Sequence, residues 1–221
     1  MRRLLGLALF ILSVFITKQG NGQSGDHWLA YSISKNVDTT YLNAKKLFRD
    51  KKKAVLLENN IAEFYLYRNG QPLTPAGKIK TSFFPSACIS FKFDDTLLLN
   101  SGLGKQAGVG VGIKIYKDKF GGSLHANSHN QYIYKLHRND TAYLNDVQAA
   151  PVFQSLKLLR RPAFSSNEVV IGEYNAVYRK FYQKRKKATD QAVIYRVRLI
   201  FKSKVTGMDS MREILQANSS R

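Results

Sequence analysis

The chain has 221 residues, of which 35 are lysine or arginine and 15 are acidic, so its formal net charge is +20. An excess of this size is larger than solubility requires, and it predicts attraction to phosphate, carboxylate or sulfate groups. The single cysteine, Cys88, excludes an intramolecular disulfide, and its apolar neighbours indicate a small core side chain rather than a catalytic thiol.

The N-terminus has the pattern of a secretory signal peptide. Arg2 and Arg3 precede the almost wholly apolar residues 4–16, a run that is shorter than the roughly 20 residues of a membrane span. Gly20 and Gly22 supply the small residues that signal cleavage requires. Cleavage after Gly22 is therefore predicted, with an uncleaved membrane anchor as the alternative.

The remaining residues, 23–221, are predicted to form a single domain, because no change of composition divides them. Removal of residues 1–22 lowers the formal net charge from +20 to +17. The protein is expected to be exported to the periplasm, to the cell surface or into the medium.

Runs rich in β-branched and aromatic residues then alternate with turn residues, which indicates strands. Strands are predicted at residues 28–34, 61–68, 78–84, 87–93, 96–99, 109–116, 124–138, 142–147 and 152–159, and twice within 169–205. Residues 41–53 fit either a short helix or an irregular strand, and residues 208–217 fit a short helix. About ten strands without helical crossovers are typical of an all-β, antiparallel sandwich or barrel.

Glycine and proline mark two of the connections. Asn69-Gly70 is a strong hairpin signal, and Pro72 predicts that the return strand is short or lies at an edge. The glycine-rich residues 101–112 match neither the dinucleotide-binding nor the P-loop spacing, because Gly108 comes one residue too late for the former. The prediction for this stretch is a flexible loop that leads into a strand, with glycines that let another part of the structure pack closely.

The last pair of strands carries the clearest pattern. Residues 193–201 place an apolar side chain at every second position, and Arg196 and Arg198 fall between them. The two strands are joined by a basic turn at residues 184–187. This hairpin therefore predicts one apolar face and one largely cationic face.

No catalytic or metal site can be assigned from the sequence. His125 and His129 would lie roughly 13 Å apart on the predicted strand, too far to share a zinc ion. The acids offer no facing pair for glycoside cleavage, and no G-x-S-x-G motif occurs. An enzyme is not the favoured interpretation, and no metal and no cofactor are predicted.

A site for anions is the preferred hypothesis. Its basic members would be Lys184, Arg185, Lys186, Lys187, Arg179, Arg196 and Arg198, and its aromatic contacts Tyr174, Tyr178 and Tyr182. Export argues against nucleic acid as the partner and favours an anionic glycan, a lipid head group or an envelope protein. The plainer alternative places the tyrosines in the core and the lysines on a solvated face.

The sequence thus predicts an exported protein of the cell envelope with a binding or structural role. The alternatives are a soluble barrel that holds a small apolar ligand, an outer-membrane β-barrel and a hydrolase.

Overall fold

The computed structural model describes residues 28–40, 42–43, 55, 57–75, 82–104, 107–185 and 188–207. The predicted signal peptide (residues 1–22) and C-terminal helix lie outside these residues, as do most of residues 41–53. Within the part described, every element is a strand, so the all-β prediction is confirmed. No helix found there is long and apolar enough to cross a membrane.

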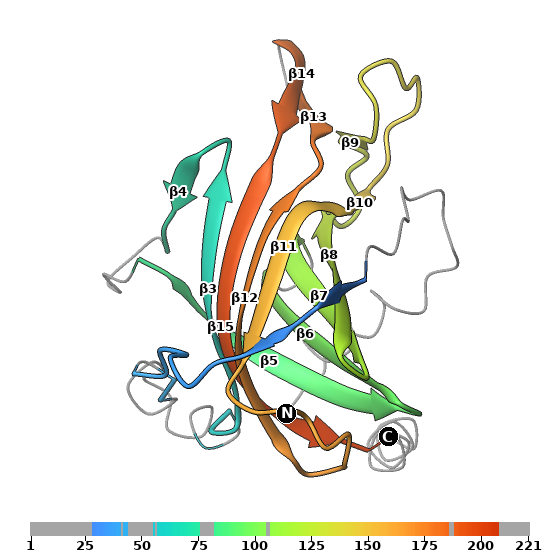
Figure 1. Cartoon of the computed structure of the whole chain (residues 1–221). Helices are drawn as coiled ribbons and strands as arrows, with labels where there is room; N and C mark the ends of the chain where they lie inside the picture. Colours follow the sequence, from blue (N-terminus) through green and yellow to red (C-terminus); the bar gives the residue numbers. More distant parts are fainter. Residues whose placement is uncertain are drawn as a thin grey trace, which may run out of the picture.

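Within the described residues, fifteen strands follow one another (Figure 1). They are β1 (Leu29–Ala30), β2 (Ser32–Ile33), β3 (Asn60–Arg68), β4 (Gln71–Leu73), β5 (Phe84–Phe93), β6 (Thr96–Gly104), β7 (Gly108–Tyr116), β8 (Lys119–Asn127), β9 (Tyr134–Lys135), β10 (Asp146–Ala149), β11 (Pro151–Leu158), β12 (Val169–Tyr178), β13 (Phe181–Arg185), β14 (Ala188–Val193) and β15 (Tyr195–Thr206).

Twelve of the strands form one strongly curved sheet in the order β1-β8-β7-β6-β5-β3-β15-β12-β11-β2, with β10 beside β8 and β4 beside β3. The chain itself connects the regions near the two ends of this sheet. Strand β10 pairs with β8 near one end, and β11, which follows β10 after a single residue, pairs with β12 near the other. The shape is therefore barrel-like, although the ladder of hydrogen bonds is not closed. Among these strands, the short pairings β11–β2 and β15–β5 are parallel, a departure from the purely antiparallel sheet that was predicted.

A second sheet of three strands, β14-β13-β9, stands at one end of the large one (Figure 1). The hairpin of residues 169–205 runs through both sheets, with β12 and β15 in the large sheet and β13 and β14 in the small one. The two long strands that the sequence predicts are therefore four, because both arms of the hairpin are interrupted between the sheets.

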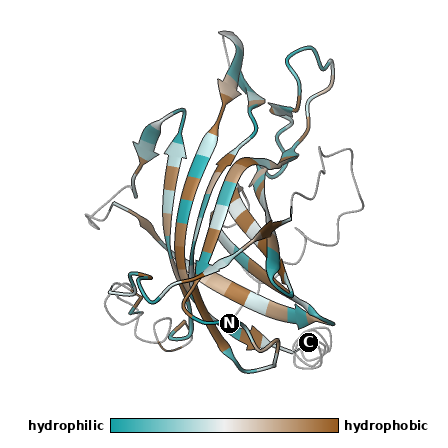
Figure 2. Cartoon of the chain, in the orientation of Figure 1, coloured by the Kyte–Doolittle hydropathy of each residue, from teal (hydrophilic) through white to brown (hydrophobic). Residues whose placement is uncertain are grey.

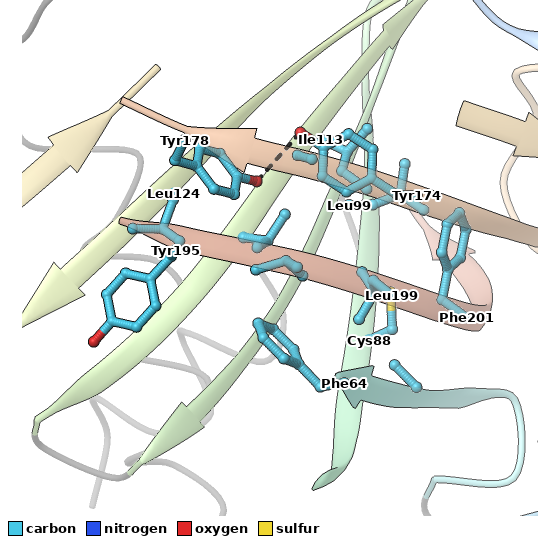
Figure 3. Packing of buried hydrophobic residues seen from close by; sticks show 14 of the residues in the cluster. Phe64, Cys88, Leu99, Ile113, Leu124, Tyr174, Tyr178, Tyr195, Leu199 and Phe201 are labelled. Atoms are coloured by element: carbon cyan, nitrogen blue, oxygen red, sulfur yellow. Dashed lines mark hydrogen bonds between the residues drawn. The ribbon is translucent and has the colours of Figure 1, made fainter. Parts of the chain in front are cut away.

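The inner face of the curved sheet carries the main hydrophobic core (Figure 3). Phe64, Tyr174, Tyr178 and Phe201 are among its largest fully buried side chains, and the Tyr178 hydroxyl donates a hydrogen bond of 3.2 Å to that of Tyr174. Cys88 is fully buried here as well, which confirms the prediction of a core residue. Large side chains at inward positions favour a packed core over an internal ligand site.

Alternation along the strands produces this core (Figure 2). Val193, Tyr195, Val197, Leu199 and Phe201 are all buried, as their spacing predicts. The intervening side chains of β15 lie on the outer face of the sheet.

The glycine-rich stretch is not a loop but the hairpin β6–β7. A Cβ on Gly104 would lie 1.9 Å from the carbonyl oxygen of Ala107, and one on Gly108 would lie 1.7 Å from that of Leu103. Glycine is needed at these positions because the two strands approach closely, so the predicted close packing is confirmed although the predicted loop is a pair of strands.

Two further strand boundaries differ from the prediction. Residues 124–138 do not form one strand, because β8 ends at Asn127 and His129 has a positive φ of 61° in the following turn. Strand β5 continues through Pro85, which pairs with Glu63, instead of breaking there. The Asn69-Gly70 turn is confirmed, with φ values of 50° and 82°, and β4 is a short edge strand that pairs with β3.

Candidate functional site on the outer face of the sheet

Four neighbouring strands, β3, β15, β12 and β11, form a regular grid on the outer face. Their register places one outward residue from each strand in a row across the sheet. The Phe153 row consists of Tyr67, Arg196, Val177 and Phe153. The Glu63 row consists of Glu63, Ile200, Glu173 and Lys157.

The Phe153 row is open to solvent. Phe153 is 58% exposed, and the preceding Val152 is 64% exposed because a register shift between Pro151 and Phe153 makes it an extra residue. This β-bulge turns two consecutive apolar side chains outward, where regular alternation would bury one of them. Beside them, the guanidinium of exposed Arg196 lies 5.7 Å from the centre of the Tyr67 ring, a cation–π contact.

The same surface continues toward the small sheet. Ile194, two residues before Arg196, is 42% exposed. Arg179 is exposed at the end of β12, where its backbone N–H donates to the carbonyl oxygen of Ala150, and exposed Lys180 follows it. We call Val152, Phe153, Arg179, Lys180, Ile194 and Arg196 the Phe153 surface.

No acid occurs in the chain segments that build this surface. Residues 66–69, 150–153, 177–180 and 194–196 contain neither aspartate nor glutamate. Their exposed basic residues are Arg179, Lys180 and Arg196, whereas Arg68 is half-buried and lies opposite the inward-facing Tyr195. The surface is therefore locally cationic as well as apolar.

In the Glu63 row, by contrast, Glu63 and Ile200 are covered, although Lys157 at the end of the row is exposed. Val37, Leu42 and Leu57 pack with the outward-facing Ile61, Ala87 and Ile200 to form a second hydrophobic cluster outside the sheet. Ile200 is only 2% exposed, and Glu63 is fully buried. The sequence does not indicate this cover, because it depends on the contact of Val37, Leu42 and Leu57 with strand residues that are distant in the chain.

Glu63 is a buried carboxyl that is only partly satisfied. The Tyr65 hydroxyl donates 2.8 Å to its Oε2, but its Oε1 has no hydrogen-bond partner. Burial raises the pKa of Glu63, and the charge of Asp38 also raises it, whereas Tyr65 and Arg198 act in the opposite direction.

Glu173 lies on the other side of Ile200, and its pKa is shifted in the opposite direction to that of Glu63. Its Oε1 accepts hydrogen bonds from Arg198 Nε at 2.8 Å and from Asn175 Nδ2 at 3.1 Å. Although desolvation raises its pKa, these two donors outweigh that effect and the pKa is lowered overall. The Arg198 guanidinium also lies 5.4 Å from the centre of the Tyr65 ring, so its charge is already engaged.

A second basic region lies in the small sheet. Lys184 Nζ and Lys135 Nζ lie 4.9 Å and 4.3 Å from the centre of the Tyr143 ring. Asp190 pairs with Lys135 at 3.0 Å and accepts a hydrogen bond of 2.8 Å from the Tyr143 hydroxyl. An acid thus offsets part of the positive charge of this region, unlike in the Phe153 surface.

The residues that the sequence predicts as an anion site are consequently divided. Arg179 and Arg196 belong to the Phe153 surface, Lys184 and exposed Arg185 belong to the small sheet, and Arg198 is ion-paired. Lys186 and Lys187 lie outside the residues described.

The predicted aromatic contacts need correction. Tyr174 and Tyr178 are buried in the core, where no surface ligand can reach them, because their positions in β12 face inward. Tyr182 is half-buried in β13. The aromatic residues beside the outward arginines are instead Tyr65 and Tyr67 of β3, which the sequence could not associate with β15 without knowing that the two strands pair.

His125 and His129 do not belong to a cluster of possible metal ligands among the described residues. Burial, with the nearby Lys114, lowers the pKa of His125 to about 4, so this ring is neutral at physiological pH. Within the part of the chain described, no group of three or more histidine, cysteine, aspartate or glutamate residues could hold a metal ion.

Comparison with protein families, with curated proteins and with solved structures found no match. The site is therefore interpreted from its own geometry.

Proposed function

We propose that this is an exported binding protein of the cell envelope that contacts an anionic component through the Phe153 surface. The observation that supports this most directly is local charge. Three basic residues, Arg179, Lys180 and Arg196, are exposed at this surface and its strand segments contain no acid, whereas Arg198 elsewhere on the outer face is paired with Glu173 and Lys135 in the small sheet with Asp190. Exposed basic side chains that are gathered on a sheet attract anions.

The signal-peptide pattern of residues 1–22 supports the envelope as the setting, because the anions met after export are lipid head groups, acidic glycans and phosphorylated polymers. Lys184 and Arg185 extend the positive field along the hairpin. Their role is to strengthen attraction at a distance rather than to make the contact.

The test compares two triple variants that remove the same charge. Arg179→Gln, Lys180→Gln and Arg196→Gln change the Phe153 surface, and Lys92→Gln, Lys114→Gln and Lys119→Gln change the strands β5, β7 and β8. The first variant is expected to bind immobilised inorganic polyphosphate more weakly, with a flatter dependence on salt, while the second stays close to the unchanged protein. Equal losses in both variants would show that only total charge matters, and the proposal would fail.

A further inference from the structure

We infer that Arg68, together with Tyr134 and Tyr195, binds the carboxylate group of a small organic acid where the small sheet joins the large one. This goes beyond the proposed function, because the Phe153 surface lies on the opposite face of the sheet. The evidence is an arginine at an inward strand position that forms no ion pair with any of the described residues.

Strand alternation places Arg68 on the inner face of the large sheet. It lies at the end of β3, two residues after Leu66, and both Leu66 and Phe64 belong to the core. Its register partner on β15 is Tyr195, which is also a core residue. Arg68 is half-buried, so part of it meets solvent, and an anion can approach it there.

The guanidinium of Arg68 is only partly satisfied. Its Nη2 donates a hydrogen bond of 2.6 Å to Oε1 of Gln183 in β13, whereas its buried Nε has no hydrogen-bond partner within the part of the chain described. Neither of the ion pairs formed there includes Arg68. A half-buried cation that lacks both a counter-charge and one hydrogen-bond partner is unfavourable, and an anion supplies both.

Two tyrosines lie beside this guanidinium. Tyr134 of β9 lies opposite Gln183 in the small sheet. Tyr195 lies opposite Arg68 in the large sheet, and Figure 3 shows its hydroxyl turned away from the other labelled core side chains. The ring of Phe181 packs against both tyrosines, with its centre 5.7 Å from that of Tyr134 and 5.9 Å from that of Tyr195. The two rings are therefore held in place by the core.

Both tyrosines can donate a hydrogen bond to an anion. Burial, with the nearby Tyr195, raises the pKa of Tyr134 to about 12, and burial also raises the pKa of Tyr195. The positive charge of Arg68 opposes both shifts, which indicates that the guanidinium is close to both rings. The hydroxyl groups are therefore protonated at physiological pH. A carboxylate can accept from the arginine and from the tyrosines at once, because each of its two oxygens has two lone pairs.

A single positive charge in a half-buried setting favours a carboxylate over a phosphate. A carboxylate has one negative charge, so its pair with Arg68 is neutral. A phosphate monoester carries about −1.5 to −2 at neutral pH, and the excess charge would lose hydration without gaining a partner.

A second arginine, in the small sheet, provides the control. Arg185 of β13 donates to Oε1 of Gln191 from Nε at 3.0 Å and from Nη2 at 2.8 Å. Like Arg68 it is bonded to a glutamine, but it is exposed and its Nε is engaged. The variants Arg68→Met and Arg185→Met therefore remove the same charge, and only the first removes the unpartnered donor.

The experiment is isothermal titration calorimetry of the purified protein with benzoate, and with benzamide and inorganic phosphate at the same ionic strength. Benzoate is expected to bind with a stoichiometry of one, and benzamide, which has a similar shape without the charge, about tenfold more weakly or worse. Arg68→Met is expected to weaken benzoate binding by about tenfold or more, and Arg185→Met to leave it unchanged. Tyr195→Phe, which keeps the ring in the core, is expected to weaken it by roughly tenfold.

Several results would overturn the inference. If benzoate does not saturate the protein, or binds Arg68→Met as tightly, then Arg68 only braces the small sheet through Gln183. Equal losses in Arg68→Met and Arg185→Met would point to total charge instead of this site. Tighter binding of inorganic phosphate than of benzoate would contradict the assignment to a carboxylate.

The tyrosine variant keeps the inference testable even if Arg68→Met does not fold. Unchanged benzoate binding by Tyr195→Phe would then contradict the site. Binding of polyphosphate by the Phe153 surface is measured separately, so the proposed function and this inference can fail independently.

Discussion

The Glu63 row and the Phe153 row lie on the same four strands, yet Glu63 and Ile200 in the first are buried and Arg196 and Phe153 in the second are exposed. Both point outward by the alternation of the strands. They differ because Val37, Leu42 and Leu57 pack over the strand positions of Ile61 and Ile200, and leave Arg196 and Phe153 in contact with solvent. Alternation along the strand therefore decides which face of the sheet a side chain lies on, and the covering segment decides whether that side chain is exposed to solvent.

The contrast extends to the charged groups. Glu63 and Glu173 flank Ile200, and their pKa values move in opposite directions, because burial dominates at Glu63 whereas the donors Asn175 and Arg198 outweigh burial at Glu173. In the open row, Arg196 contacts a tyrosine ring and keeps its charge available. The charges of Glu173 and Arg198 therefore serve the structure as an ion pair, whereas the charge of Arg196 is exposed to solvent.

The largest expected effect is on the free energy of unfolding, when a covered isoleucine and an exposed isoleucine are each replaced by alanine. Ile200→Ala removes a buried side chain and is expected to lower the free energy of unfolding by about 2–5 kcal/mol. Ile194→Ala, on the exposed surface, is expected to change it by no more than about 0.5 kcal/mol. Urea denaturation of both variants measures the difference, and similar values would show that the cover over Ile200 does not form in solution.

A smaller effect concerns pH and the buried carboxyl. The raised pKa of Glu63 means that the folded protein holds this proton more tightly than the unfolded chain, whose pKa is near the ordinary 4.5. Stability contributed by this group is complete below that value and is lost as pH rises through the folded pKa. Relative to the unchanged protein, Glu63→Gln should therefore become more favourable as pH increases.

Unfolding curves recorded across a pH series test this expectation, with Glu58→Gln as a control at a glutamate that is exposed. A difference between Glu63→Gln and the unchanged protein that is constant with pH would mean that Glu63 is hydrated and ionises normally.

The smallest effect is expected for the ion pair between Arg198 and Glu173. Because Arg198 remains partly exposed, the coupling should be only about 0.2–1 kcal/mol in a double-mutant cycle with Arg198→Met and Glu173→Gln. The lowered pKa of Glu173 means that its contribution is present above the ordinary pKa of 4.5 and disappears as the solution becomes more acidic. A coupling that persists unchanged below this range would contradict the assignment.

Much of the fold was predictable because strand signals are local. The Asn69-Gly70 turn, the edge position of Pro72 and the buried face of β15 all follow from properties of neighbouring residues. The glycine-rich hairpin was predicted only in part, since the close packing at its glycines was expected but the pairing of β6 with β7 was not. Of the candidate surface, Arg179 and Arg196 were named from their charge and stay predictions, whereas Phe153 carries no signal of its own in the sequence.

Side-chain alternation and charge are properties of each segment, so the all-β class, the two faces of the long hairpin and the cationic character of its outer face follow from the amino-acid sequence. The folded arrangement of the strands was needed to show that Tyr174 and Tyr178 belong to the core, that Glu63 is buried and that a bulge exposes Phe153 beside Arg196. These outcomes depend on strand register and on which distant segment covers a face, and neither is encoded within a single stretch of the chain.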